Sequence, residues 1–320
     1  MTESPKTRRA PFIVVCVVIA FLGVTYLLIG DRTVWGAWIS VAPPILFALV
    51  LIPAIVRAKS WIAAALLVAF LATTSEWPRF GAETRASHDT LRLVSWNIGA
   101  GNSSWASAVE SLDPDIVLAQ ESSKPILMWD EFTWTGTPDP GTLTHFPVEV
   151  LPTEKVGPWV EPQLLLVEMR GKKVLVANVR LMLPSIVIQL VAPFEERPVE
   201  NYRARTAQYE KLVALVQSTA ETTGTDAVII AGDFNIPARM QSIAPLRESF
   251  NDAWQQAGSG WGATVPEFLP LTRIDHVWMS ENIEIVSVRV HRLAGSDHRA
   301  VVVDFDLLDQ TMVDVEQTDR

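Results

Sequence analysis

The first part of the chain contains three apolar stretches separated by short polar breaks. Residues 11–30 carry no charge, and at about 1.5 Å per helical residue they are long enough to cross a hydrocarbon layer of about 30 Å. A second stretch, residues 34–56, is interrupted by Pro43 and Pro44, which kink a helix. A third stretch, residues 61–74, is shorter. The pattern predicts three transmembrane helices.

The flanks of this predicted membrane region, residues 11–74, indicate its orientation. Basic residues precede the first helix and fill the loop between the second and third helices: Lys6, Arg8, Arg9, Arg57 and Lys59. Positive residues mark the cytoplasmic side, so residues 1–10 are expected to form a cytoplasmic tail and everything after the third helix to lie on the outer face of the cytoplasmic membrane. A cleaved signal peptide is the alternative for the first stretch. Residues 75–89 are polar, lack periodicity and are expected to form a linker.

Beyond the linker, short apolar runs alternate with turn signals, and a few segments show helical periodicity. Two helices are expected, at residues 104–111 and 203–219, and in the second one Tyr209, Leu212 and Val216 share an apolar stripe. Strands are expected at residues 91–96, 116–119, 164–168, 173–179, 227–231, 276–279, 283–291 and 300–307. This alternation predicts an α/β domain in which two β-sheets pack face to face with helices outside.

The net charge of the chain limits the classes of molecule that it is expected to bind. The formal net charge is −10, and residues 91–320 carry 18 Lys and Arg against 31 Asp and Glu. A protein that grips duplex nucleic acid by its phosphates usually carries a basic excess, so duplex nucleic acid is a poor candidate partner. Acidic residues can still bind a cation that in turn binds phosphate, so a small phosphate ester remains open. The one cysteine, Cys16, cannot form an intramolecular disulfide.

Five polar motifs follow or precede the predicted strands, at positions where a sheet presents side chains to a shared cleft. They are Ser95-Trp96-Asn97, Gln120-Glu121, Gly232-Asp233-Phe234-Asn235, Arg273-Ile274-Asp275-His276 and Gly295-Ser296-Asp297-His298. Each motif alone is weak, because an Asp-Phe-Asn turn or an Asp-His pair occurs in many unrelated proteins. Their combination in this order indicates a catalytic site.

Together these motifs resemble the endonuclease/exonuclease/phosphatase superfamily, the fold shared by DNase I-like nucleases and several phosphatases. The resemblance covers residues 90–309, leaves residues 310–320 as a C-terminal tail, and rests on LVSWNIGAGN, PDIVLAQES, VIIAGDFNIPA, TRIDHVWMS and GSDHRAVVVDF. It implies a four-layer α/β/β/α sandwich and hydrolysis of a phosphate ester. Membrane helices followed by such a domain also resemble bacterial proteins of the teicoplanin-resistance type, which favours a substrate of the cell envelope.

The resemblance also implies metal ligands. Glu121 matches the family's metal ligand, Asn97 is similar to the neighbouring residue of the metal site, and Asp297 would supply a second carboxylate. Carboxylate and amide oxygens suit Mg²⁺ or Mn²⁺, and the chain shows no Cys/His set typical of zinc.

The remaining motif residues match catalytic positions of the family. Asp233 would orient or deprotonate the attacking water, and Asn235 would donate to the phosphoryl oxygens. His298 would contact the scissile phosphate as imidazolium or general acid, with Asp275 as the partner that fixes its tautomer.

One position departs from the family pattern. The family often carries Asn-x-His-Leu where this chain reads Asn178-Val179-Arg180-Leu181, so that Asn178 matches and Arg180 replaces a histidine. An arginine can bind a phosphate oxygen bidentately but cannot act as a general acid near neutral pH. The alternative is that Arg180 marks an inactive member.

The sequence therefore predicts a membrane-anchored, divalent-metal-dependent phosphoesterase, and its predicted place at the membrane favours a lipid-linked phosphate ester as the substrate. A metal-dependent nuclease outside the cell is the enzymatic alternative. The alternative outside enzymology is a membrane receptor that keeps the fold as a phosphate-binding module.

Overall fold

The computed structural model describes residues 5–74, 79, 90–99, 105–122, 131–136, 139–158, 160–182 and 202–309. The expected linker, apart from Arg79, and the C-terminal tail lie outside these residues. The chain divides into two compact units. The first comprises Met1–Trp77, Ser185–Ala204 and Arg239–Ser242, and the second comprises Pro78–Pro184, Arg205–Ala238 and Ile243–Arg320.

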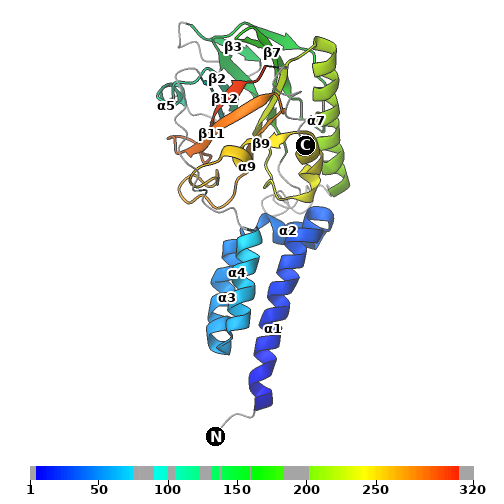
Figure 1. The fold of residues 1–320 in the computed structure, drawn as a ribbon, viewed down its shortest axis with the longest axis vertical. Helices are drawn as coiled ribbons and strands as arrows, with labels where there is room; N and C mark the ends of the chain where they lie inside the picture. The colour runs from blue at the N-terminus through cyan, green and yellow to red at the C-terminus, as the bar shows by residue number, and fades with distance from the viewer. Residues whose placement is uncertain are drawn as a thin grey trace. The chain divides into compact units, whose positions relative to one another are not determined.

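The first unit is helical (Figure 1). Its helices are α1 (Pro5–Val24), which continues through a π turn (η1, Thr25–Ile29) and a 3₁₀ turn (η2, Gly30–Arg32), then α2 (Val34–Val41), α3 (Pro44–Ala58) and α4 (Trp61–Thr74). One row of residues packs between α1, α3 and α4, including Ile19, Leu51 and Leu67, while many other apolar side chains of these helices are exposed. Asp31 is buried, and its carboxylate accepts hydrogen bonds from the backbone N–H groups of Gln241 and Ser242 at 2.8 and 3.1 Å.

The proline pair separates two helices within the second apolar stretch, where the sequence predicts one kinked helix. Ala42 is extended, with φ −69° and ψ 132°, because a residue before proline avoids the helical region. The helical segments on the two sides, Trp35–Val41 and Pro44–Ala58, meet at 91°. Only Phe12–Arg32 is by itself long and apolar enough to cross a membrane among the described helices, and the bent pair would count as a second span if it is one segment. The helix Trp61–Thr74 is shorter.

The second unit contains two six-stranded sheets. The first has the order β11-β12-β1-β2-β4-β3, with β1 (Leu91–Asn97), β2 (Ile116–Gln120), β3 (Thr133–Gly136), β4 (Gly141–Thr144), β11 (Ile283–His291) and β12 (Ala300–Leu307). The second has the order β5-β6-β7-β8-β10-β9, with β5 (Val148–Leu151), β6 (Gln163–Met169), β7 (Lys172–Arg180), β8 (Ala227–Asp233), β9 (Asn251–Asp252) and β10 (Asp275–Met279).

The two sheets pack face to face, and helices lie outside them. The core between the sheets joins residues such as Leu93 and Leu118 of the first sheet to Val176 and Ile229 of the second. Helix α5 (Trp105–Glu110) packs on the outer face of the first sheet, where its residues join a separate apolar cluster. Helix α7 (Tyr202–Thr223) runs beside the second sheet (Figure 1). Two short helices, α8 (Ala244–Ser249) and α9 (Ala253–Ala257), follow β8.

The alternation of side chains along each strand gives the inner core a polar end. On β1, Leu91 and Leu93 face the second sheet, and Asn97 ends the same row because every second residue points to one face. The same row ends or begins with Gln120 on β2, with Asn178 and Arg180 on β7, with Asp233 on β8 and with Asp275 on β10. Strands β1 and β2 are parallel, as are β7 and β8, while β10 runs antiparallel to β8 and pairs Asp275 with Asp233. The polar residues of each sheet therefore gather at one end of the strands.

The two expected helices and all eight expected strands of this unit are present, with boundaries shifted by at most four residues. The apolar stripe of the second helix is confirmed, because Tyr209, Leu212 and Val216 are buried. Strands β3, β4, β5 and β9 were not expected. They have two to four residues, too few for an alternating pattern to emerge, and β3 and β4 contain Gly136 and Gly141 at their ends.

Substitution of Gly232, which precedes Asp233 in its motif, tests how closely the neighbouring strands pack. Gly232 has φ +144°, and a Cβ added there would lie 1.9 Å from the carbonyl oxygen of Val179 on the neighbouring strand. We expect Gly232→Ala to lower the free energy of unfolding by about 3 kcal/mol or more, because strain and a backbone clash act together. The measurement is denaturant unfolding of the full-length protein in detergent, followed by tryptophan fluorescence.

The matched control is Gly224→Ala. Gly224 also has a positive φ, +62°, but nothing lies within 4 Å of an added Cβ. This variant should lose only about 1 kcal/mol, the cost of a left-handed backbone with a side chain. Equal losses in the two variants would contradict the close strand contact at Gly232.

Candidate active site

A buried cluster of two carboxylates and one imidazole lies at the polar end of the inner core. The imidazole Nδ1 of His298 is 2.9 Å from Oδ2 and 3.1 Å from Oδ1 of Asp275. Asp233 joins them, and one potential ligand atom from each of these three residues lies within 4.8 Å of the others. Asp233 and Asp275 are each 1% exposed and His298 is 8% exposed. The pairing of His298 with Asp275 that the resemblance implied is present, and its catalytic role stays a prediction.

Asn97 connects this cluster to Glu121. Its Nδ2 donates to Asp233 Oδ2 at 3.0 Å and to Glu121 Oε1 at 3.1 Å, so the two carboxylates lie on either side of one amide group. The Asn97 side-chain oxygen accepts from the Gly99 N–H at 3.1 Å, which fixes the orientation of the amide.

Asn235 lies beside Asp233 in a left-handed turn, with φ +56°. Its backbone N–H donates to Asp233 Oδ1 at 2.9 Å, and its Nδ2 donates to Asp233 Oδ2 at 3.1 Å and to the Leu181 carbonyl at 2.7 Å. Asparagine tolerates a positive φ better than most residues. In this arrangement Asn235 holds the Asp233 carboxylate.

The loop before β12 positions His298 through its backbone. The Ser296 hydroxyl donates to the Asn97 carbonyl at 2.6 Å and accepts from the His298 N–H at 3.0 Å. The indole N–H of Trp96 donates to the His298 carbonyl at 3.0 Å. Ser296 belongs to a motif that the sequence singles out, but nothing in the sequence shows that its side chain ties two strands together.

Burial and charge shift the pKa values of this cluster. Burial, followed by the charge of Asp275, raises the pKa of Asp233 to about 7, although His298 and the Asn97 hydrogen bond oppose the rise. Burial lowers the pKa of His298, but the charge and hydrogen bond of Asp275, with help from Asp233, outweigh it and raise the pKa to about 9. A carboxylate that titrates near neutrality beside a protonated imidazole is the arrangement expected of a general base and a cationic group at a reaction centre.

Arg180 does not stand free at the site. Its guanidinium donates to Glu121 Oε1 at 2.6 Å and to Asp139 Oδ2 at 2.8 Å. The other oxygen of Asp139 accepts from the Glu121 backbone N–H at 2.9 Å, where Glu121 has φ +57°. Asp139 thus fixes both the arginine and the strained backbone of Glu121. Sequence reasoning missed Asp139, because it lies outside the predicted strands and belongs to no motif.

Asn178 lies apart from the open side of the site. It is fully buried, and its Nδ2 donates to the Gly141 carbonyl at 2.9 Å, while its Oδ1 accepts from Gln120 Nε2 at 2.8 Å. These bonds join β7 of the second sheet to β2 and β4 of the first. Its expected catalytic role stays a prediction, and the visible role is to hold the two sheets in register at the polar end of the core.

Asp297 is exposed, although it is adjacent to His298 in sequence. Its carboxylate is not part of the cluster of Asp233, Asp275 and His298, but its charge contributes to the raised pKa of His298. Its expected role as a metal ligand stays a prediction.

The neighbouring residues Arg273 and His276 form a separate buried network. Arg273 donates to both oxygens of Asp252, at 3.0 and 2.8 Å, and contacts His276 Nδ1 at 2.9 Å. His276 Nε2 is 2.8 Å from the Ile236 carbonyl, and burial together with Arg273 lowers the pKa of this imidazole to about 4. This network is structural, because it ties β9 and β10 to the turn after Asp233.

The residues of the cluster fit a hard divalent cation. Asp233 and Asp275 are buried carboxylates that repel one another. Glu121 and Asp233 both accept hydrogen bonds from the side-chain amide of Asn97, and all three carboxylates offer oxygen atoms. Mg²⁺ and Mn²⁺ prefer such ligands, and a bound cation relieves the repulsion of neighbouring carboxylates.

The fold and the buried Asp-His cluster define an α/β sandwich hydrolase, and comparison with known proteins gives the family. A family model described as Endonuclease/Exonuclease/phosphatase family matches residues 94–298, more than half of the chain. The chain therefore belongs to the endonuclease/exonuclease/phosphatase family, whose members are phosphoesterases or nucleases that generally use a divalent metal. No curated protein matches the chain in a sequence search.

Solved structures show the same fold at low sequence identity. A family member from Bacteroides thetaiotaomicron is 14% identical with a TM-score of 0.52, covering 69% of this chain and 96% of its own. A mannosyl-6-phosphatase from the same organism is 14% identical with a TM-score of 0.51, covering 68% and 100%. Truncated TDP2 from Caenorhabditis elegans is 20% identical with a TM-score of 0.50, covering 69% and 98%.

The raised pKa of His298 gives a prediction for the metal-free protein. In Asp275→Asn, the imidazole loses the charge that outweighs burial, so its pKa should fall from about 9 toward the ordinary value of about 6.5. Since the folded-state pKa lies above the unfolded one, the stability from this pair is complete below pH 6.5 and is lost as pH rises through 9. The stability of Asp275→Asn should therefore not fall in this way as the pH rises through 9. Histidine NMR titration and unfolding against pH, both in EDTA, measure the two effects.

Asp306→Asn is the control for this substitution. It removes a carboxylate of β12 that pairs with Arg170 at 3.1 Å, away from the cluster. The His298 titration should stay that of the parent protein. An unchanged His298 pKa in Asp275→Asn would show that the hydrogen bond between the two residues does not set the charge of the imidazole.

Proposed function

We propose that this protein hydrolyses a phosphate ester with the help of Mg²⁺ or Mn²⁺. The observation that carries the proposal is the buried cluster of His298, Asp275 and Asp233, connected through Asn97 to Glu121. Hydrolysis of a phosphate ester needs neutralisation of the phosphoryl oxygens, an oriented water and stabilisation of the leaving oxygen, and the cluster offers groups for all three.

Each residue has a task in this proposal. Asp233, with its pKa near 7, orients the attacking water and accepts its proton. His298 is protonated at neutral pH because of Asp275, so it stabilises negative charge on the phosphoryl group. Glu121 and Asn97, with Asp297 as the predicted additional ligand, would hold the metal, which supplies charge neutralisation when bound.

Arg180 adds a fixed positive charge beside Glu121. Its side chain is 40% exposed, so the guanidinium can reach a bound anion while Asp139 retains it. A guanidinium binds a phosphoryl oxygen without titrating, whereas the histidine common at this position in the family would titrate. The ion pairs are intact, which favours a working site over an inactive one.

The proposed location is the outer face of the cytoplasmic membrane, with a lipid-linked phosphate as the substrate. Support comes from the apolar helix Phe12–Arg32, the bent pair Trp35–Val41 and Pro44–Ala58, and the apolar helix Trp61–Thr74, which we propose as three spans. The basic residues Lys6, Arg8 and Arg9 at the start of α1, and Arg57 and Lys59 at the end of α3, favour a cytoplasmic N-terminus. A site anchored near a bilayer meets lipid-linked phosphates at high local concentration.

The alternatives have less support. A nuclease would have to bind a polyanion with a domain in which acidic residues outnumber basic ones by 31 to 18. A receptor without activity would not need the buried Asp-His pair, whose burial is costly unless the charges are used or compensated.

The proposal predicts turnover only with a divalent cation. The full-length protein in detergent is screened with Mg²⁺ and with Mn²⁺ against aryl phosphates, phospholipids, polyprenyl diphosphates and DNA. On the best substrate, His298→Ala should lower kcat/KM by about 10²–10⁴-fold, and Arg180→Ala should cost about 2–4 kcal/mol of transition-state stabilisation. His145→Ala, at an exposed position after β4, is the control and should keep the parent activity. Undiminished turnover in excess EDTA would refute metal dependence.

The proposed topology has its own test. A reporter that is active only outside the cytoplasm should be active when fused after Asp89, because three spans from a cytoplasmic N-terminus end outside. The matched fusion after Lys59, in the loop between the second and third spans, should be inactive. Activity of the Lys59 fusion alone would show that the spans are counted or oriented wrongly.

A further inference from the structure

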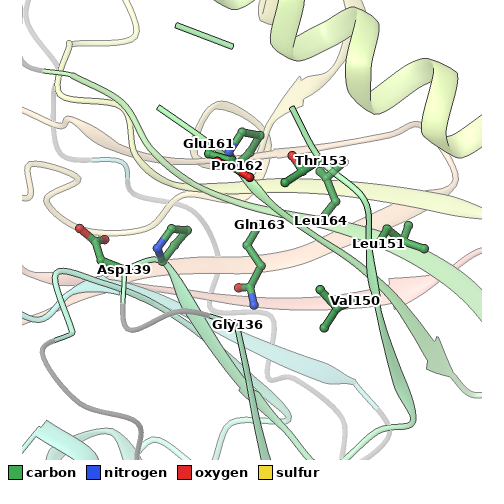
Figure 2. Close-up of a pocket in the computed structure, with 10 residues that line it drawn as sticks. Gly136, Asp139, Val150, Leu151, Thr153, Glu161, Pro162, Gln163 and Leu164 are labelled. Atoms are coloured by element: carbon green, nitrogen blue, oxygen red, sulfur yellow. The ribbon is translucent and has the colours of Figure 1, made fainter. Parts of the chain in front are cut away.

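A pocket of about 280 Å³ lies between the free edges of the two sheets, beside the candidate active site. Its walls come from β3 and the start of β4 in the first sheet, and from β5 and the start of β6 in the second. Strands β3 and β5 are the edge strands of their sheets, so the space between them is not filled by a further strand. Figure 2 shows Asp139 at one end of the pocket and Val150 and Leu151 at the other.

The floor of the pocket is a built feature. Gln163 spans the two sheets, since its Nε2 donates to the Thr135 carbonyl at 2.9 Å and its Oε1 accepts from Thr142 Oγ1 at 2.7 Å. Figure 2 shows its side chain directed toward Gly136, where an added Cβ would lie 2.0 Å from Gln163 Nε2. The glutamine and the glycine therefore keep the two edges apart at a fixed distance.

Asp139 joins the pocket to the candidate active site. Asp139 lines the pocket, and its carboxylate accepts from Arg180 and from the Glu121 N–H. A phosphoryl group held at Arg180 would therefore have the rest of its molecule next to the pocket.

The chemistry of the lining selects for an apolar occupant. Val150, Leu151 and Leu164 form an apolar wall, and Val150 is 55% exposed. The described lining residues include two acidic residues, Asp139 and Glu161, and no lysine or arginine. A second phosphate or a nucleic-acid strand would be repelled from this pocket. Its volume, at the lower end of the range for ligand sites, suits one group and not a polymer.

We propose that this pocket binds the alcohol part of the substrate, the leaving group, as an apolar chain. The inference rests on the proposed function, because it assigns the pocket to the same hydrolysis. It selects esters with one phosphate and an apolar alcohol over nucleic acids and other polyanions. The side-chain determinant is Val150, which is exposed to the pocket.

The first experiment compares phenyl phosphate with 4-butylphenyl phosphate, whose leaving groups have nearly equal acidity. The full-length parent protein should show kcat/KM about 10- to 100-fold higher for the butyl ester, because the pocket buries up to four carbons. Val150→Trp fills the pocket and should bring this ratio close to one. The control is Leu269→Trp, since Leu269 is equally exposed, at 56%, and lies outside the pocket lining; it should keep the parent ratio.

A binding measurement separates this inference from the proposed function. Calorimetric titration with neutral 4-butylphenol should show binding that Val150→Trp abolishes and Leu269→Trp retains. Turnover of both esters with a ratio near one in the parent protein would overturn the pocket and leave the proposed function standing. Absence of turnover, with butylphenol binding that depends on Val150, would overturn the proposed function and the leaving-group assignment together.

Discussion

The burial of Asp233, Asp275 and His298 at one end of the inner core is the constraint on which the rest of this domain depends. Two carboxylates within a few ångströms of one another are unfavourable away from water unless cations or donors compensate them. His298 supplies a charge, and the donors come from Asn97 and Asn235. The charges of these residues are thus coupled, and removal of one partner changes the protonation of the others.

The surrounding structure keeps this balance in place. The alternation of each strand ends the apolar rows with polar side chains, and Asn178 joins the sheets directly behind them. Ser296 ties the loop of His298 to the end of β1, while Asp139 holds both Arg180 and the backbone of Glu121. These contacts are made by residues from distant parts of the chain, so the geometry of the site is as rigid as the packing of the two sheets.

The same arrangement separates the charge-bearing and apolar parts of the site. Arg180 offers a positive charge beside Asp139, and the pocket that Asp139 also lines has an apolar wall. A substrate with one phosphate and an apolar alcohol matches both parts, whereas a polyanion matches only the first. The acidic balance of the domain favours the same class of substrate.

The sequence by itself determined the class of fold, the long strands and the site motifs, because these depend on local periodicity and on residues that follow strands directly. It also determined the break at Pro43 and Pro44, since proline acts on its own backbone. Only the tertiary structure decided that Asn178 is buried between the sheets, that Asp297 is exposed beside a buried His298, and that Arg180 pairs with Glu121. Asp139 could not be found from the chain, because its role arises from contacts with Arg180 and Glu121, which are distant in sequence.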